Sequence, residues 1–224
     1  MTCFEELIAA VEGADSAAHL LQTTRALATA LDGLRQDTSS AAPPGEALAC
    51  LVRILGYNNP GAAVAAVDGL IASGPAAVSA VLEGLDDRNY GARAWAVRAL
   101  AGIGDVRGLD LLEQALADDV GPSVRRAAAI GLGTLRVELL EPSDREAVQA
   151  RALKALQEAR LDAEWVVRYA VAAALEQLAL QLLPRERKHG EAVSALTELA
   201  DIEQEEVPVV RLRASLALTR LTTP

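Results

Sequence analysis

Aromatic residues are scarce in this sequence: one Phe, three Tyr and two Trp make up 3% of its 224 residues. A large central core normally uses more rings than this. Ala and Leu dominate the hydrophobic 51% of the chain instead, and small residues with high helix propensity favour stacked helices over a sheet. Runs of β-branched residues in strict alternation are missing too. The sequence therefore predicts an all-α protein.

Cysteine and histidine are equally few, with Cys3, Cys50, His19 and His189 as the complete set. The two thiols are far apart and lack the CxxC spacing of a metal or redox site, so we expect both to be free. The sequence contains no HExxH, phosphate-binding Gly loop or GxSxG motif. We expect no metal site and no self-contained reactive centre, although a Ser-His-Asp arrangement stays open because only the fold can form it.

Positive charge is also in deficit, and the formal net charge is −10. An acidic protein is a poor nucleic-acid binder unless its Arg residues cluster on one face. No apolar run reaches the ~20 residues needed to cross a bilayer. Glu5 and Glu6 near the start argue against a secretory signal. We expect a cytoplasmic protein without a membrane span or a nucleic-acid partner.

An internal repeat is the strongest pattern present. Five segments align, at 61–70, 91–100, 123–132, 166–175 and 209–218, and each ends in Leu preceded by Gly or Ala. A small residue beside a large one lets neighbouring helices interlock. The third residues of the segments, 30 to 43 positions apart, are Ala63, Arg93, Arg125, Arg168 and Arg211. Periods of ~30–45 residues are typical of helical repeat arrays.

The Arg column needs compensation, because a cation in the first turn of a helix opposes the helix dipole. Acidic residues in the preceding turns can cap the helices and pair with these Arg residues. They are Asp86, Asp87, Asp118, Asp119, Asp162, Glu205 and Glu206. This Asp-turn-Val-Arg pattern resembles the HEAT repeat. We expect Arg125, Arg168 and Arg211 to form a ladder from repeat to repeat.

The predicted fold is an all-α, HEAT-like α-α superhelix, a right-handed solenoid of about five to six helix pairs that forms one domain over residues 1–224. Residues 1–34 are predicted as capping helices, since terminal repeats are often atypical. Residues 35–45 are predicted as a flexible loop. Residues 46–224 then hold five repeats, with partner helices near 46–56, 75–85, 106–117, 144–159 and 187–201.

Trp95 departs from the repeat pattern. Its equivalents are Ala65, Ala127, Ala170 and Arg213, so we expect it to be partly exposed. Arg98 lies three residues on and shares its helix flank, and Asn89, Tyr90 and Arg93 are near. An aromatic plane beside two guanidinium groups suits a flat, anionic, conjugated ligand. The alternative is a Trp that fills a gap between repeats, with Arg98 in solvent.

The other rings follow a similar habit. Trp165 and Tyr169 lie four apart at the start of an inner helix, and Tyr57 precedes another. Helix starts on one edge of a solenoid form a continuous rim, and a rim rich in Tyr, Trp and Arg suits binding. The alternative is that helix entry turns simply need anchors.

Several segments are far more specific than a generic HEAT repeat. They read LGYNNPGAAVAAVDGLIASG (55–74), NYGARAWAVRALAGIGD (89–105), SVRRAAAIGLGTLR (123–136) and EWVVRYAVAAAL (164–175). From about residue 50 onward the chain resembles F-type subunits of the E/F-type phycobilin lyase family. The resemblance implies a heterodimer with an E-type subunit that attaches phycocyanobilin to a cysteine of the phycocyanin α subunit through a thioether bond. It implies phycocyanobilin as a transferred substrate and no permanently bound cofactor.

The resemblance also gives the candidate residues roles. Arg93 and Arg98 would hold the bilin propionates, and Trp95 or Tyr90 would stack on a ring. Further binding candidates are Asn89, Trp165 and Tyr169, and the weak catalytic candidates, for hydrogen bonds to the pyrrole nitrogens, are Asp86 and Asp87. A related isomerising subfamily carries a His-Cys pair that this sequence lacks, which favours plain transfer. Two alternatives stay open: a non-catalytic HEAT-repeat scaffold, and a lyase for another phycobiliprotein.

Overall fold

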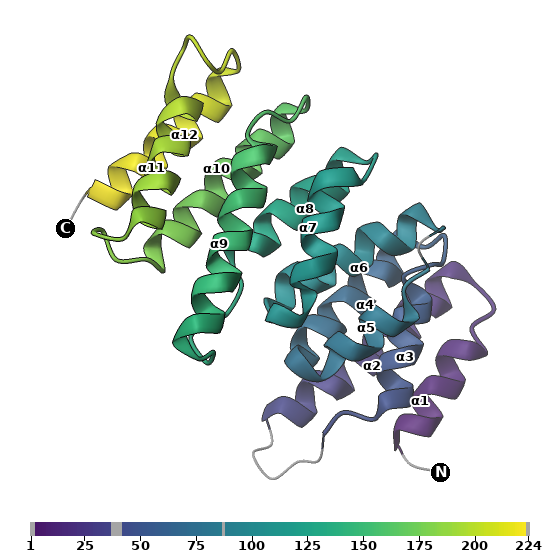
Figure 1. Ribbon diagram of the computed structural model, residues 1–224. Coiled ribbons are helices and arrows are strands. Elements are labelled where there is room, and N and C mark those ends of the chain that lie inside the picture. The colour runs from purple at the N-terminus through teal and green to yellow at the C-terminus, as the bar shows by residue number, and fades with distance from the viewer. Residues whose placement is uncertain (1–2, 37–41, 87, 223–224) are drawn as a thin grey trace. The chain divides into compact units, whose positions relative to one another are not determined.

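The computed structural model describes residues 3–36, 42–86 and 88–222. Helices and no strand occur in these ranges, which confirms the all-α prediction. The chain groups into two compact units, unit 1 over residues 1–105 and unit 2 over residues 106–224. Within each unit, antiparallel helix pairs pack beside one another (Figure 1). One domain over 1–224 stays a prediction.

Unit 1 pairs the outer helices α1, α3 and α5 with the inner helices α2, α4 and α6. The bounds are α1 Cys3–Glu12, α2 Ala17–Gln36, α3 Gly45–Ile54, α4 Pro60–Ser73, η1 Gly74–Ala77, α5 Val78–Gly84 and α6 Tyr90–Ile103. The inner helices pack in sequence order, α2 on α4 and α4 on α6. The predicted loop 35–45 is shorter than expected, because α2 continues to Gln36 and α3 already begins at Gly45; its residues 37–41 lie outside the described ranges.

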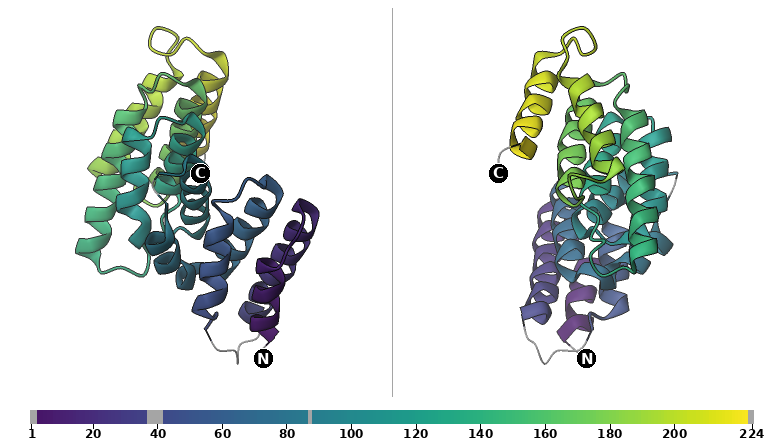
Figure 2. Two further views of the ribbon diagram at one scale, coloured as in Figure 1. Left: turned by 90° about the vertical axis from the view of Figure 1, so that its right-hand side faces the viewer. Right: turned by 60° about the vertical axis from the view of Figure 1, so that its left-hand side comes forward.

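Unit 2 has the same plan, with longer outer helices in its last two pairs. Its elements are η2 Val106–Gly108, α7 Leu109–Asp118, α8 Pro122–Gly133, α9 Pro142–Ala159, α10 Trp165–Leu180, α11 Arg187–Ala200 and α12 Pro208–Thr222. The inner helix α10 packs between α8 and α12, while α12 packs on α10 and α11 (Figure 2). All five predicted partner helices are present, within a few residues of the expected bounds.

The repeat columns form the core. Of the five Leu residues in the last column, Leu70, Leu100, Leu132 and Leu175 are fully buried, and Leu218 of the last inner helix is half-buried. The small column lets inner helices touch: a Cβ on Gly69 would lie 2.8 Å from the Cβ of Ala28 in α2. This close approach confirms the interlocking that the small residue predicts.

The segment Pro60–Gly84 is long and apolar enough to cross a membrane by length and composition, with a mean hydropathy of 1.6 in an 18-residue window. It is divided at Gly74, whose φ of 60° ends α4 before η1 and α5 begin. Half of the window is buried inside the structure, where α4 and α5 supply much of the core of unit 1. Such a segment is weak evidence for a span, because core helices pass the same test.

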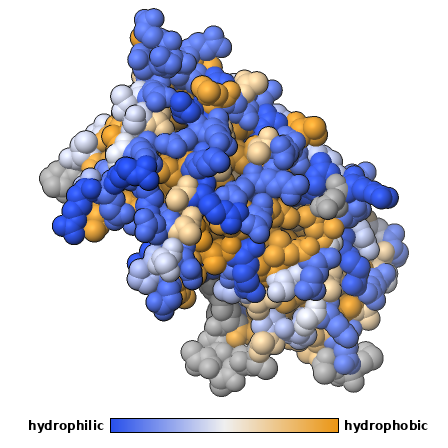
Figure 3. Space-filling model, viewed as in Figure 1, coloured by the Kyte–Doolittle hydropathy of each residue, from blue (hydrophilic) through white to orange (hydrophobic). Residues whose placement is uncertain are grey.

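The surface drawn in Figure 3 is mostly hydrophilic, with hydrophobic residues showing between the polar ones. The fold therefore divides the 51% of hydrophobic residues between a packed interior and a limited number of exposed positions. Those exposed positions carry information, because single apolar residues on a surface are ordinary but aligned ones indicate a binding face.

Candidate functional site

Asn89 is the N-cap of α6 and joins two repeats of unit 1. Its Oδ1 accepts a hydrogen bond from the backbone N–H of Ala92 at 3.1 Å, and its Nδ2 donates to the carbonyl of Gly56 at 3.1 Å. Asn59 does the same at the start of α4, capping Ala62 and donating to the carbonyl of Ala17 at 2.9 Å. The side chain of Asn89 is thus used by the fold, and its part in ligand binding stays a prediction.

The four ring and guanidinium residues of α6 form two cation–π pairs. The guanidinium carbon of Arg93 lies 5.8 Å from the ring centroid of Tyr90, and that of Arg98 lies 5.7 Å from the ring centroid of Trp95. Tyr90 and Arg98 are exposed, whereas Arg93 and Trp95 are half-buried. Partial exposure of Trp95 was the sequence-based expectation, and it is confirmed.

The two pairs occupy different flanks of α6. Arg93 and Trp95 are two residues apart, which separates them by about 200° around a helix of 3.6 residues per turn. Arg98 and Trp95 share one flank. Arg93 falls in the repeat position of the ladder residues Arg125 and Arg168. The structure therefore offers one guanidinium, that of Arg98, beside Trp95, where the sequence analysis expected two.

The weak catalytic candidates lie in the turn before α6. Asp86 is exposed, and its Oδ1 accepts a hydrogen bond from the backbone N–H of Arg88 at 3.0 Å. This bond shapes the entry turn. Asp87 lies outside the described residues.

Trp165 and Tyr169 lie at the start of α10 in unit 2. Trp165 is the first residue of the helix and is 45% exposed, and Tyr169 is half-buried one turn later. A spacing of four residues puts both rings on one face of the helix. The structure thus brings these two candidates together within unit 2, as the rim prediction requires of them.

A mostly apolar face, which also holds the exposed Arg126, continues from Tyr169 onto the neighbouring inner helices. The fourth and eighth repeat positions share a helix face, and in unit 2 they hold Arg126, Ile130, Tyr169, Ala173, Leu212 and Leu216. Ile130, Leu212 and Leu216 are exposed, and α8, α10 and α12 pack side by side. We call these six residues the inner face. The sequence analysis missed this face. A signal was present, because the fourth and eighth repeat positions vary in residue type, unlike the small and Leu positions that form the core.

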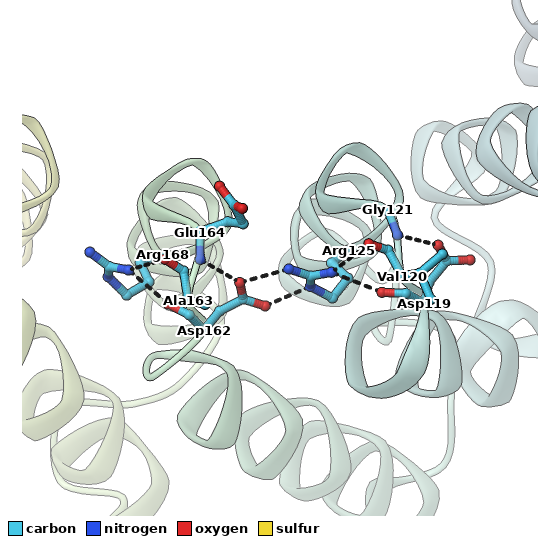
Figure 4. A network of polar contacts seen from close by, with 8 residues as sticks. All are labelled: Asp119, Val120, Gly121, Arg125, Asp162, Ala163, Glu164 and Arg168. Carbon is cyan, nitrogen blue, oxygen red and sulfur yellow. Dashed lines mark hydrogen bonds and ion pairs between the residues drawn. The ribbon is translucent and has the colours of Figure 1, made fainter.

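Arg125 and Arg168 confirm two rungs of the predicted ladder in unit 2, and Figure 4 draws the rung of Arg125. The prediction was wrong for Arg211, which pairs with no carboxylate of the described residues and bonds only to the carbonyl of Glu205. The Nε and Nη2 of Arg125 donate to the two carboxylate oxygens of Asp162 at 2.7 and 2.9 Å. Those of Arg168 donate to the carboxylate of Glu205 at 2.6 and 2.8 Å. Each Arg therefore binds the acid of the following repeat, and not the acid in its own preceding turn as the sequence suggested.

The preceding turn supplies carbonyl oxygens to each Arg. Nη1 of Arg125 donates to the carbonyl of Asp119 at 2.9 Å, and Nη1 of Arg168 to that of Asp162 at 2.7 Å. The acids do not cap their helices: Asp162 Oδ1 accepts from the N–H of Glu164, two residues on, at 2.9 Å. The guanidinium has several N–H donors, so Nη1 can bind a carbonyl of the preceding turn while Nε and Nη2 bind the carboxylate, which is why one Arg links two turns.

The ladder residues are mostly buried, and their ionisation reflects their partners. The hydrogen bonds from Arg168 hold the pKa of the Glu205 carboxyl below its usual value. Burial alone would raise the pKa of Asp162, but hydrogen bonds from Arg125 and the backbone outweigh it and the pKa is lowered. The hydrogen bond to Glu205 correspondingly raises the pKa of Arg168. These groups stay charged and serve structure.

A second set of ion pairs, which the sequence analysis did not find, joins the outer helices of unit 2. Arg151 of α9 pairs with Asp110 of α7 at 2.6 Å and also with Glu113. Arg160, after α9, pairs with Glu198 of α11 at 2.7 Å. The outer helices vary in length and register, so no sequence column marked these pairs.

Cys3 is exposed and Cys50 is buried, and both are free thiols, as expected. In the ranges that the structure describes, no group of three or more His, Cys, Asp or Glu residues is arranged to hold a metal ion. Burial raises the pKa of the Cys50 thiol.

Comparison with known proteins agrees with this architecture. A family model described as HEAT repeats matches residues 51–133. A solved structure, the complex of CpcE and CpcF of phycocyanin lyase from Nostoc sp. PCC7120, contains a chain that is 40% identical, with a TM-score of 0.71 over 78% of this chain and 99% of that chain. The predicted HEAT-like fold is thereby confirmed.

Two curated relatives are more similar in sequence. The "Phycocyanin alpha phycocyanobilin lyase CpcF" of Synechocystis sp. is 51% identical over 79% of this chain and 77% of the relative. The "Phycocyanobilin lyase subunit beta" of Thermosynechococcus vestitus is 47% identical over 95% of this chain and 93% of the relative. With identity of this extent over more than three quarters of each chain, the protein belongs to the family of phycocyanobilin lyase subunits.

Proposed function

We propose that this chain is one subunit of a heterodimeric lyase that attaches phycocyanobilin to a cysteine of the phycocyanin α subunit through a thioether bond. The observation that carries the proposal is the 51% identity to a relative named for that reaction. The similarity to a chain of the CpcE–CpcF complex supports an E-type subunit as the partner. Phycocyanobilin is then a substrate that is held and passed on, and no cofactor is retained.

The chemistry of the reaction fits a helical stack. The acceptor cysteine supplies the nucleophile, so the lyase subunit has to hold the bilin extended and oriented against that thiol. The bilin offers a conjugated plane and two propionates. The Trp95 ring beside the Arg98 guanidinium presents a stacking surface and a cation on one flank of α6.

Among the candidates, we assign the bilin contact first to Trp95 and Arg98. Arg98 is exposed, and its charge is not part of the repeat pattern, since the equivalent residues are Asp68, Ile130, Ala173 and Leu216. Tyr90, Trp165 and Tyr169 remain further candidates for stacking. Asp86 or Asp87 are proposed as hydrogen-bond partners of the pyrrole nitrogens, and Asn89 and Arg93 as secondary polar contacts.

We also propose a cytoplasmic location and no nucleic-acid partner. A net charge of −10 disfavours binding to phosphate backbones. Two free thiols are typical of a reducing compartment.

Co-expression tests the function directly. The chain is produced with its E-type partner, a bilin-synthesis pathway and the phycocyanin α subunit, and covalent colour is read on a denaturing gel. We expect colour on the α subunit only when both lyase chains are present. Absence of colour with every acceptor subunit would favour the scaffold alternative, and colour on another phycobiliprotein alone would favour the other-acceptor alternative.

Variants then test the site. Trp95→Ala with Arg98→Ala should reduce the labelling rate strongly while the helical circular dichroism spectrum is retained. Arg25→Ala, which removes an exposed cation from α2 of the same unit, is the matched control and should label normally. Normal labelling by the Trp95 and Arg98 variant would remove this pair from the site and leave the lyase function standing.

A further inference from the structure

Three Arg residues of unit 2 share one anchoring bond. Nη1 of Arg125, Arg168 and Arg211 donates to the backbone carbonyl six residues earlier, at 2.9, 2.7 and 2.7 Å. In Arg125 and Arg168 the remaining edge, Nε with Nη2, then binds the carboxylate of the following repeat. The anchoring bond therefore presents a guanidinium edge that is ready for a bidentate acid.

Arg211 has the anchor without the acid. Among the residues that the structure describes, no carboxylate lies within ion-pair distance of Arg211, and its guanidinium makes one hydrogen bond, to the carbonyl of Glu205. The edge of Arg211 that corresponds to the ladder contacts of Arg125 and Arg168 is open.

The surface of α12 beside Arg211 matches surfaces that are covered elsewhere in unit 2. Ser215 and Thr219 are exposed on α12, and the equivalent residues of the preceding inner helices are buried against the next repeat. Those residues are Ala129 and Gly133 in α8, and Ala172 and Glu176 in α10. The position of Ser215 and Thr219 is thus a helix-packing position that no described helix occupies.

One polar group of this surface already has its partner within the helix. The hydroxyl of Thr219 donates to the carbonyl of Ser215 at 2.9 Å, so its bond is made within the helix. Leu212 lies next to Arg211 and is 69% exposed. A face of small side chains with an exposed Leu and an anchored Arg has the composition of an interface centre.

We propose that this α12 face, made of Arg211, Leu212, Ser215 and Thr219, binds the E-type partner subunit. A partner carboxylate would occupy the open edge of Arg211 as Asp162 and Glu205 occupy those of Arg125 and Arg168. The proposal rests on the proposed function, because that function supplies the partner.

The ladder indicates which partner segment fits. Asp162 and Glu205 each also accept a hydrogen bond from the backbone N–H two residues on, at 2.9 and 2.8 Å, so each acid sits in a turn that leads into a helix. Arg213 and Arg220 of α12 already pair with the buried carboxylate of Glu176 in α10, so Arg211 is the cation of this face that complements an acidic segment. The partner segment is therefore an Asp or Glu in a turn directly before a helix.

Affinity of the purified chains for each other tests the interface. Isothermal titration measures the dissociation constant between the E-type subunit and the wild type, Arg211→Ala, Arg211→Lys or Leu212→Asp. Arg187→Ala is the control, because it removes a guanidinium that is 86% exposed on α11. We expect Arg211→Ala to weaken binding at least about tenfold, since the partner carboxylate loses its bidentate donor. The affinity of Arg211→Lys should lie between those of the wild type and Arg211→Ala, because an ammonium group keeps the charge but lacks the planar fork.

Stability of the free chain separates an interface role from a folding role. Arg211→Ala loses one hydrogen bond, to the carbonyl of Glu205, but breaks no ion pair of the described residues, so its thermal midpoint should fall far less than that of Arg168→Ala, which breaks a buried pair. Wild-type affinity of both Arg211→Ala and Leu212→Asp would overturn the interface and leave the lyase function intact. Failure of the wild-type chains to associate would overturn both proposals. Loss of self-association in Arg211→Ala, seen by ultracentrifugation without a change in E-type binding, would assign the face to a second copy and overturn the partner named here.

Discussion

Arg168 binds the carboxylate of Glu205 through two nitrogen atoms, at 2.6 and 2.8 Å, although the residues are 37 positions apart in the sequence. Both side chains are largely buried, with Glu205 only 3% exposed. Such a pair links the start of α10 to the α11–α12 turn and holds consecutive repeats in register. Removal of one of the two side chains leaves the other charge buried without a partner. This lowers the stability by more than the intact pair contributes to it.

Arg168→Ala should therefore lower the free energy of unfolding by about 3–5 kcal/mol, because Glu205 is left buried and unpaired. Urea denaturation followed by circular dichroism measures it. Lys154→Ala is the control, since Lys154 and Glu158 form an exposed pair at 4.0 Å whose loss should cost about 0.5 kcal/mol or less. A change of similar size in both variants would contradict the structural role of the ladder.

Acid should weaken unit 2 through the same residues. The folded-state pKa values of Asp162 and Glu205 lie below their ordinary values. Their contribution to stability is complete above those ordinary values, near pH 4, and is lost as the pH falls through the lower folded values. The urea midpoint should fall steadily between about pH 5 and pH 3.

A paired replacement isolates the contribution of one rung to that acid sensitivity. Arg168→Met with Glu205→Met removes both charges, and apolar replacement of a buried pair is often neutral or stabilising. We expect near wild-type stability at pH 7 and a shallower loss of stability in acid. An unchanged pH profile in the double variant would show that other carboxylates cause the acid effect.

Gly133 has no room for a side chain. A Cβ there would lie 2.5 Å from the Cα of Ala174 and 2.7 Å from its carbonyl oxygen, so backbone would have to move. Gly133→Ala should destabilise the protein by about 1–3 kcal/mol. Gly190→Ala, in α11 of the same unit and with open space around its Cβ, should instead be stabilising by up to about 1 kcal/mol. We expect the thermal midpoint to fall in Gly133→Ala and to rise in Gly190→Ala. An unchanged midpoint in Gly133→Ala would contradict the close contact between α8 and α10.

The thiols should differ in reactivity. Cys50 is 1% exposed and burial raises the pKa of its thiol, whereas Cys3 is exposed. A colorimetric disulfide reagent should titrate one thiol in the folded protein and two in denaturant, because the thiolate is the reactive form. Cys3→Ser should abolish the fast reaction, and a fast reaction that persists in this variant would show that α3 opens readily.

Arg93 and Arg98 should separate in function. Arg98→Ala removes the guanidinium beside Trp95 and should raise the KM for bilin transfer with little change in thermal midpoint. Arg93→Ala removes the residue at the ladder position of α6 and should mainly lower the thermal midpoint. Transfer assays on both variants, beside their melting curves, check this division. Equal loss of transfer at unchanged stability would return both residues to one site.

The Arg ladder shows most clearly which contacts could be predicted from the sequence and which could not. Repeat spacing identified Arg125 and Arg168, because a helix position and its chemical role recur with each repeat. It named the wrong acid for each, since the pairing depends on how successive turns stack. Local spacing also placed Arg98 beside Trp95. The sequence analysis grouped Arg93 with them because it is near in sequence, although a separation of two residues puts Arg93 on another flank of the helix.

What the sequence by itself determined is the all-α repeat, its core columns and the family, because these follow from periodicity and residue type along the chain. The tertiary structure alone decided which turn supplies the carboxylate, which inner-face residues stay exposed and which Arg edge remains open. Such facts depend on contacts between residues nearly 40 positions apart, as in Arg168 with Glu205 and Arg151 with Glu113, and packing fixes those distances.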